Sequence, residues 1–321
     1  MLSAPKASVL MTAYNREAYI ADAIESVLGQ TFDDFELVIV DDGSSDRTVA
    51  IAQEYERRDR RVRVVINERN LGDYGNRNRA ASFARGEFLK YHDSDDLMYP
   101  HCLSIMVAAL ESVPAAGFAL SGSRAWPGGP CPMLSTPRMS FQREFLGYGM
   151  FHLGPACALF RTSVLRELGG FTDLGAASDY VFWLRACARY PVLLLPGDLF
   201  WYRTHAGQEL RSARAVRDYA RVPGHAWRAL AAPDCPLEPN EREQAKRNQA
   251  YGTGKAIWHA VRRGRPSLAA FMLRHCGMST GDWLVYLRPP RRSVEAGSPL
   301  DAAGQYLTPA QRSPVRATRV S

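Results

Sequence analysis

The chain has 321 residues, a net charge of +7, and the 46% hydrophobic and 23% charged content of a soluble globular protein with a substantial core. Its six cysteines are scattered without a C-x-x-C pair, which argues against a disulfide scaffold and favours free thiols in a reducing compartment. No apolar run is long enough to span a bilayer and the N-terminus has no secretory pattern, so the sequence predicts a cytoplasmic protein.

The first hundred residues alternate predicted strands and helices. Apolar runs predict strands at 7–14, 35–40, 61–66 and 86–91, and helical periodicity or capping predicts helices at 17–30, 47–58 and 74–85. The uninterrupted apolar character of the second strand suits a parallel sheet that is covered on both faces. We therefore expect a doubly wound α/β layer, in which ligands bind beyond the carboxyl ends of the strands.

Further along the chain the patterns change twice. A helix near 100–112, a strand at 117–123 and an irregular Pro- and Gly-rich loop at 124–140 are followed by strands and helices up to about residue 205. Helical patterns at 209–231 and 240–263 come next. We expect an α/β domain at 1–207, a helical region at 208–290 and a disordered tail at 291–321.

The net charge is unevenly distributed between these parts. Residues 206–321 hold 19 Lys and Arg against 9 Asp and Glu, whereas residues 1–205 carry a net charge near −3. The basic part is either a solvated helical surface or a surface attracted to anionic lipid or to a phosphate-bearing acceptor. Nucleic acid is a weaker candidate, because no recognised binding motif accompanies the charge.

Two of the predicted strands end in carboxylates, in "IVDDGSSD" (39–46) and "KYHDSDD" (90–96). Such clusters are unfavourable unless a cation or a donor-rich ligand lies opposite. A Rossmann dinucleotide site and a P-loop both need Gly-rich motifs, which the first strand end, "TAYNRE", lacks. Asp93 and Asp95 are spaced so that both can face one Mg²⁺ or Mn²⁺, which would also bind a substrate diphosphate.

Three blocks carry a resemblance to a known family: "SVLMTAYNREAYIADAIESVLGQTFDDFELVIVDDGSSDRT", "NLGDYGNRNRAASFARGEFLKYHDSDD" and "FRTSVLRELGGFTDLGAASDYVFWLR". In order and spacing, over about 200 residues, they resemble family 2 glycosyltransferases. The resemblance implies the GT-A fold, a Rossmann-like doubly wound mixed α/β sheet, here with a helical C-terminal extension that the resemblance does not cover. It implies inverting, metal-dependent transfer from a nucleotide-diphosphate sugar, UDP- or dTDP-type favoured, to a hydroxyl of a saccharide or lipid-linked saccharide, in the synthesis of a cell-surface polysaccharide or glycoconjugate.

The resemblance also implies roles for individual residues. Asp93, Asp95 and His205 would hold Mn²⁺ or Mg²⁺, and Asp179 would be the general base of a single in-line displacement. Asp42, with Asp41 as the alternative, would accept the imide N–H of a uracil or thymine ring. The nucleotide-sugar-binding residues would be Thr12, Ala13, Tyr14, Asp42, Arg77, Asn78, Asp93 and Ser94.

For three of these residues the alternative is a purely structural role. In that case Asp42 would only cap its own turn, Asp179 would cap the helix that starts at 178, and Arg77 would pair with Asp73 or Glu87. The aromatic side chains of Phe182, Trp183 and Trp201 are expected in the core rather than as sugar platforms.

For the whole protein, the rival hypothesis is a non-catalytic nucleotide-sugar-binding module of a polysaccharide assembly complex. A nucleotidyltransferase would need a Gly-rich loop after the first strand, which is absent. Peripheral contact with the inner membrane face through the basic C-terminal region, the oligomeric state, the sugar and the acceptor stay open.

Overall fold

A computed structural model describes residues 4–122, 132–147, 149–197, 199–205, 213–286 and 305–306. Its elements are, in chain order, β1 (Ala7–Ala13), α1 (Ile20–Leu28), β2 (Phe35–Asp41), α2 (Thr48–Arg58), β3 (Val62–Ile66), α3 (Asp73–Ser82), β4 (Phe88–Asp93), β5 (Leu97–Met98), α4 (Cys102–Glu111), β6 (Phe118–Ser121), β7 (Met133–Ser135), α5 (Pro137–Phe145), the 3₁₀ turn Pro155–Cys157, β8 (Ala158–Arg161), α6 (Thr162–Glu167), α7 (Ser178–Arg189), β9 (Val192–Leu195), β10 (Phe200–Trp201), α8 (Ala213–Tyr219), α9 (Val222–Ala231), α10 (Pro239–Arg262), α11 (Pro266–His275), α12 (Thr280–Tyr286) and β11 (Gln305–Tyr306).

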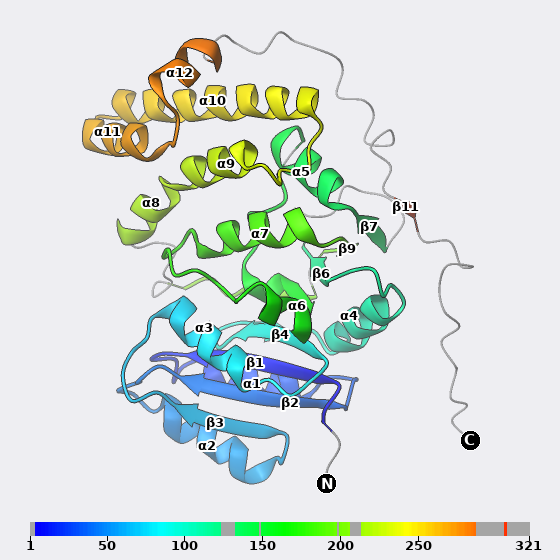
Figure 1. Cartoon of the computed structure of the whole chain (residues 1–321). Helices are drawn as coiled ribbons and strands as arrows, with labels where there is room; N and C mark the ends of the chain where they lie inside the picture. The colour runs from blue at the N-terminus through cyan, green and yellow to red at the C-terminus, as the bar shows by residue number, and fades with distance from the viewer. Residues whose placement is uncertain are drawn as a thin grey trace.

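The main sheet has the order β7-β9-β6-β8-β4-β1-β2-β3, and the two-residue β11 extends it at the β7 edge. β1 pairs in parallel with β2 and β4, and β2 with β3, whereas β8 runs antiparallel to β4 and β6. The strand order reverses at β1, so the carboxyl ends of β1 and β4 form a switch point of the kind at which α/β sheets bind ligands. This mixed, doubly wound sheet confirms the predicted fold class (Figure 1).

Alternate side chains of the strands pack against helices on the two faces of the sheet. Val9 and Met11 share a core with residues of α1, α2 and α4, whereas Leu10, Val38 and Tyr91 share one with residues of α3, α6 and α7. All five side chains are fully buried. Both faces are therefore covered, as the uninterrupted apolar run at 35–40 predicts.

Residues 213–286 form α8 to α12. The predicted helix 209–231 begins outside the described residues, and its described part, 213–231, is two helices. Pro223 lies in the first turn of α9, where a proline suits a helix start but not a helix interior. The predicted helix 240–263 is confirmed as α10, which is followed by α11 and α12, two short helices that the sequence patterns did not predict. Among the helices that the structure describes, none combines the length and the apolar character needed to span a bilayer.

The helical part stacks on the α/β part in layers. Figure 1 shows α7, α9 and α10 following one another away from the sheet, with α10 to α12 at the opposite end of the molecule from β3 and α2, and α9 contacts both α7 and α10. The predicted boundary at 207–208 lies outside the described residues. So does the predicted tail from 291, apart from β11.

Gly86 and Gly252 offer a matched pair for testing how tightly the sheet packs. A Cβ on Gly86 would lie 2.7 Å from the backbone of Ala7 and Ser8 in β1, whereas a Cβ on Gly252, in exposed α10, would meet nothing within 4 Å. We expect Gly86→Ala to lower the free energy of unfolding by about 1–3 kcal/mol, because backbone cannot move aside. Gly252→Ala should instead raise it by up to about 1 kcal/mol. Denaturant unfolding measures both, and equal effects would contradict this packing.

Candidate active site

The register of the sheet brings the predicted donor-binding residues together. Thr12 of β1 lies beside Asp93 of β4, and Ala13 lies beside Asp41 of β2. Tyr14 follows immediately, and its side chain is 48% exposed, so a face of its ring is open to a ligand. The carboxyl ends of three neighbouring strands thus share one edge of the sheet.

The turns after β1 and β2 are joined to each other. Asn15 has a positive φ of 51°, a conformation that Asn tolerates better than most residues, and its Oδ1 accepts a hydrogen bond from Ser45 N at 2.9 Å. Asn15 N donates to Ser44 Oγ at 2.9 Å. Asp41 accepts hydrogen bonds from Gly43 N and Ser44 N. Capping of the "DDGSSD" turn therefore falls to Asp41, not to Asp42.

Asp42 instead holds the loop that precedes α3. It is 3% exposed, and its carboxylate accepts hydrogen bonds from Asn67 Nδ2 at 2.7 Å, Leu71 N at 2.8 Å and Gly72 N at 2.9 Å. A carboxylate can accept about four hydrogen bonds, so three of its positions are already used within the protein. Asp42 thus has a structural function at the site, whatever it adds toward a ligand.

Arg77 on α3 is the centre of the site. Its side chain is buried, and its guanidinium donates from Nη2 to Asp93 Oδ1 at 2.7 Å and from Nε to Asp73 Oδ1 at 2.9 Å. Its Nη1 is buried and has no hydrogen-bond partner among the described residues. The pairing with Asp73 was expected, whereas Glu87 pairs with Lys6 instead.

The acidic residues after β4 differ in charge state. Burial opposes ionisation of Asp93, but the Arg77 guanidinium holds the pKa of that carboxyl below its usual range. For Asp96, burial and the nearby Asp93 raise the pKa to about 8, so at neutral pH this carboxyl is mostly protonated. Negative charge at the site is therefore concentrated away from Asp96.

Asp95 lies opposite His205, as the predicted metal site requires. Asp95 Oδ2 lies 2.9 Å from His205 Nε2 and accepts a hydrogen bond from Arg16 Nε at 3.0 Å. Arg203 secures this contact by donating from Nε to the Asp95 carbonyl at 2.8 Å. The antiparallel pairing of β10 with β5 brings this distant part of the chain to the site.

The predicted metal ligands are not assembled as one set. Asp95 faces His205, whereas Asp93 is paired with Arg77. Within the ranges that the structure describes, no group of three or more His, Cys, Asp or Glu side chains is arranged to hold a metal ion. A divalent cation at Asp95 and His205 would need further oxygen ligands, which phosphates commonly supply.

Asp179 lies in the first turn of α7, not at its cap position, but its carboxylate still satisfies one N–H group of that turn. Its Oδ1 accepts a hydrogen bond from Tyr180 N at 2.6 Å, while the residue at the cap position, Ala177, makes no side-chain hydrogen bond. Burial raises the pKa of Asp179 to about 7, and the Arg77 guanidinium and Asp73 carboxylate act on it in opposite directions. Asp179 is thus within electrostatic reach of the Arg77 cluster.

Asn78 binds the backbone of Phe171, and Trp201 is not the core residue that the sequence predicts. Asn78 donates from Nδ2 to the Phe171 carbonyl at 2.7 Å and accepts from Phe171 N at 2.8 Å, so one donor and one acceptor position of its amide are used within the protein. Trp201 is 45% exposed because β10 belongs to a two-stranded ribbon, whereas Phe182 and Trp183 are core residues as predicted. Ser94 is buried beside the carboxylates.

Sequence reasoning missed several residues of the site. Arg16 and Arg203 contact Asp95, and Tyr219 of α8 is close enough to Asp179 that, together with burial, this carboxylate raises the pKa of the tyrosine to about 12. Arg16 and Arg203 lie within two residues of Tyr14 and His205, but no spacing rule selects them. Tyr219 lies outside the resembling blocks altogether.

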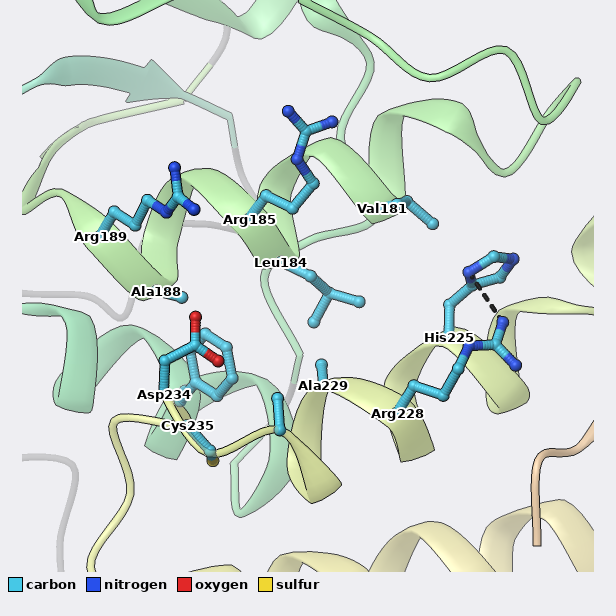
Figure 2. A pocket seen from close by; sticks show the side chains of 12 residues that line it. Val181, Leu184, Arg185, Ala188, Arg189, His225, Arg228, Ala229, Asp234 and Cys235 are labelled. Carbon is cyan, nitrogen blue, oxygen red and sulfur yellow. Dashed lines mark hydrogen bonds between the residues drawn. The ribbon is translucent and has the colours of Figure 1, made fainter. Parts of the chain in front are cut away.

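Two hollows in the protein lie apart from this cluster. One of about 290 Å³ lies between α7 and α9 and is lined by Leu184, Arg185, His225 and Arg228 among others (Figure 2). A second of about 390 Å³ lies between α3 and α6. Neither is lined by Asp95 or Asp179, so the candidate site is defined here by its side-chain contacts.

Comparisons with known proteins bear on this geometry. Residues 8–169 match the family described as glycosyl transferase family 2. The glycosyltransferase MJ1057 of Methanocaldococcus jannaschii is 36% identical over 209 residues, which are 62% of this chain and 71% of that protein. The GalNAc(5)-diNAcBac-PP-undecaprenol beta-1,3-glucosyltransferase of Campylobacter jejuni is 35% identical over 104 residues, which are 32% of this chain and 34% of that protein.

Solved structures share the fold. S. aureus TarS 1–349, in complex with UDP-GlcNAc, has a TM-score of 0.59 and 24% identity, over 76% of this chain and 70% of that one. The mannosyltransferase PcManGT from Pyrobaculum calidifontis, in complex with GDP-Man and Mn²⁺, has a TM-score of 0.57 and 18% identity, over 88% of this chain and 79% of that one. These likenesses agree with the mixed sheet and its C-terminal helices.

The three N–H groups that donate hydrogen bonds to the Asp42 carboxylate predict a loss of stability for Asp42→Asn. An amide would point an N–H group at one of the three N–H donors, so we expect the free energy of unfolding to fall by about 1.5–3 kcal/mol. Asp33→Asn is the matched control, because Asp33 is an exposed loop carboxylate. Chemical denaturation in the absence of ligand measures both variants. Equal stability of Asp42→Asn and the control would contradict the anchoring function.

Proposed function

Since the chain belongs to glycosyltransferase family 2, and is therefore a glycosyltransferase, we propose that it transfers a sugar with inversion from a UDP- or dTDP-linked donor to a hydroxyl of a saccharide or lipid-linked saccharide. One observation carries this proposal. Arg77 binds Asp93 at the tip of β4 and also acts on Asp179 of α7, so the donor-side carboxylate and the candidate base lie around the same cation. A non-catalytic module would have no use for such a base.

The nucleotide-sugar donor would bind at the carboxyl end of β1. The exposed ring of Tyr14 offers a stacking face for a base, with Thr12 and Ala13 beside it. The unused acceptor capacity of Asp42 suits the imide N–H of uracil or thymine, and Arg77 Nη1 is a buried donor that a phosphate or sugar oxygen would satisfy. UDP-GlcNAc in the related TarS structure supports a uridine donor.

The residues at Asp95 fit a divalent metal ion. A carboxylate oxygen and an imidazole nitrogen lie 2.9 Å apart, both largely shielded from solvent, and together they suit Mn²⁺ or Mg²⁺ whose remaining ligands come from a diphosphate and water. When bound, the ion would neutralise charge that develops on the leaving diphosphate. Arg16 shares the same Asp95 oxygen, so it is placed to move toward the phosphates when that oxygen is taken.

Asp179 would perform the proton transfer. Its ionised carboxylate removes the proton from the acceptor hydroxyl as that oxygen bonds to the anomeric carbon, while the bond from this carbon to the diphosphate breaks on the opposite face. A pKa of about 7 suits a general base at neutral pH, because it combines a substantial ionised fraction with adequate basicity.

The acceptor is proposed from the C-terminal part of the chain. The Campylobacter relative is named for an undecaprenol-linked substrate, and this chain adds a basic helical region next to α7. Both support an acceptor held at a membrane surface during the synthesis of a cell-surface polysaccharide or glycoconjugate, with the enzyme peripheral to the inner membrane face.

Asp95→Asn tests the metal site. A neutral amide is a poor ligand for a hard cation, so we expect sugar transfer to fall by at least about a hundredfold, with thermal stability unchanged within a few degrees. The assay measures transfer or hydrolysis of UDP-, dTDP- and GDP-sugars with and without Mn²⁺, alongside thermal shifts for donor binding. Asp33→Asn, at an exposed carboxylate in the loop before β2, is the control. A wild type that neither binds nor turns over any donor would reject the proposed function.

Asp179→Asn separates catalysis from structure. Removing a general base slows reactions by roughly 10²–10⁴-fold, so we expect that loss in kcat with donor affinity near normal. In the wild type, kcat/KM should rise with pH through about 7 as Asp179 ionises.

The same raised pKa makes a prediction for stability. Because the folded pKa of Asp179 lies above its ordinary value, the folded state binds the extra proton and loses stability as pH rises from about 4 to about 7. Asn cannot ionise, so at pH 8 Asp179→Asn should unfold at a temperature equal to or above that of the wild type. A collapse of both stability and donor affinity would show that Asp179 is a structural residue.

A further inference from the structure

The C-terminal helices contain a long stretch with positive charge alone. Residues 244–281, all of them described, include seven Lys and Arg and no Asp or Glu. They run from the second turn of α10 through α11 to the start of α12. Lys246 lies 3.6 Å from Glu243, just before this stretch, but an excess of positive charge remains. Such an excess is unfavourable by self-repulsion, and an anionic partner would relieve it.

Four residues of α10 form what we term the basic aromatic stripe: Tyr251, Lys255, Trp258 and Arg262. Their spacing of four, three and four residues places them on one face of the helix. All four are exposed, while Ala250, Thr253 and Ala260 of the same helix are buried on the other side. The Arg262 guanidinium lies 4.7 Å from the centre of the Trp258 ring. The stripe therefore alternates rings and cations along a face that the described part of the chain leaves exposed.

Apolar side chains are exposed on the same group of helices. Val261 and Leu273 are each 53% exposed, and Leu284 is 78% exposed, the largest fraction of any large hydrophobic side chain that the structure describes. Aromatic and aliphatic groups next to Lys and Arg are characteristic of helices that lie in a membrane interface, where rings sit at the headgroups and cations meet lipid phosphates.

Charge decides between the candidate occupants of this face. A second copy would bring seven more cations against it, and residues 287–321 of the same chain carry six arginines and only two acidic residues. Both are repelled. A nucleic acid would satisfy the cations but would leave the exposed aliphatic groups facing hydrated phosphates. An anionic lipid surface satisfies both.

We propose that the basic aromatic stripe of α10 docks this enzyme on an anionic lipid bilayer. Because α7, α9 and α10 follow one another in space, the bilayer would lie on the Asp179 side of the site, where the acceptor is expected (Figure 1). The link to the acceptor rests on the proposed function, whereas docking itself does not.

Vesicle flotation of the full chain, without donor, tests docking. The probes are vesicles of phosphatidylcholine and phosphatidylglycerol in equal parts, and vesicles of phosphatidylcholine alone. We expect binding to the anionic vesicles that weakens with added salt, and little binding to the neutral ones. The double variant Lys255→Glu with Arg262→Glu should bind at least about thirtyfold more weakly, and Trp258→Ala several-fold more weakly with the same salt dependence.

The matched control is Arg57→Glu with Arg60→Glu. It changes the net charge equally, on exposed residues of α2 and the turn after it, at the far end of the molecule. This control should retain vesicle binding within about twofold if the surface, not the total charge, is responsible. Equal losses in the two double variants, or equal binding to neutral vesicles, would overturn the proposal.

Two further outcomes would replace the lipid with another partner. Sedimentation that shows a dimer dissociated by Trp258→Ala would identify a second copy as the occupant. Salt-sensitive binding of an oligonucleotide by a chain that ignores vesicles would identify a nucleic acid. Since no sugar transfer is measured, failure of the proposed glycosyltransferase reaction would leave the flotation result unaffected.

Discussion

The site depends on one buried guanidinium. Arg77 brings a positive charge to the edge of the sheet, where it is shared between Asp73 at the start of α3 and Asp93 at the tip of β4. A buried charge is tolerable only when it is paired, so Arg77 requires these carboxylates. The charge of Arg77 also lowers the pKa of Asp179 of α7, against the larger effect of burial. Arg77 thus connects sequence segments that lie a hundred residues apart.

A second connection comes from residues 199–205, where the chain comes back to the carboxyl end of β4. β10 pairs with β5 directly after the acidic cluster, and this pairing lets Arg203 and His205 reach Asp95. The contact is costly in chain entropy because 110 residues separate Asp95 from His205, so it needs several bonds at once. The Asp95–His205 half of the candidate site therefore forms only when the whole α/β part has folded.

The sequence predicts most of the fold but only part of the site. Apolar runs reveal β1, β2 and β4, and the parallel pairing of β1 with β4 then places Thr12 beside Asp93. The use of Asn78 on Phe171 could not be predicted, because an amide is equally suited to a ligand and to a backbone. Trp201 is exposed because its strand belongs to a small two-stranded ribbon. A strand of two residues is too short to show a periodic pattern in the sequence.

Charge is divided between the two parts of the chain according to what each would bind. The α/β part is slightly acidic overall, so an anionic sugar donor would be attracted only by the few cations buried near the strand ends. Arg77 is one of these cations, and its Nη1 makes no hydrogen bond among the described residues. Such a site favours selective binding, because the ligand must place an acceptor atom opposite this fixed N–H group. The C-terminal helices instead spread exposed cations over a surface, which favours a broad anionic partner over a precise one. Donor selection and acceptor localisation would thus be separate properties of one chain, joined where α7 contacts α9.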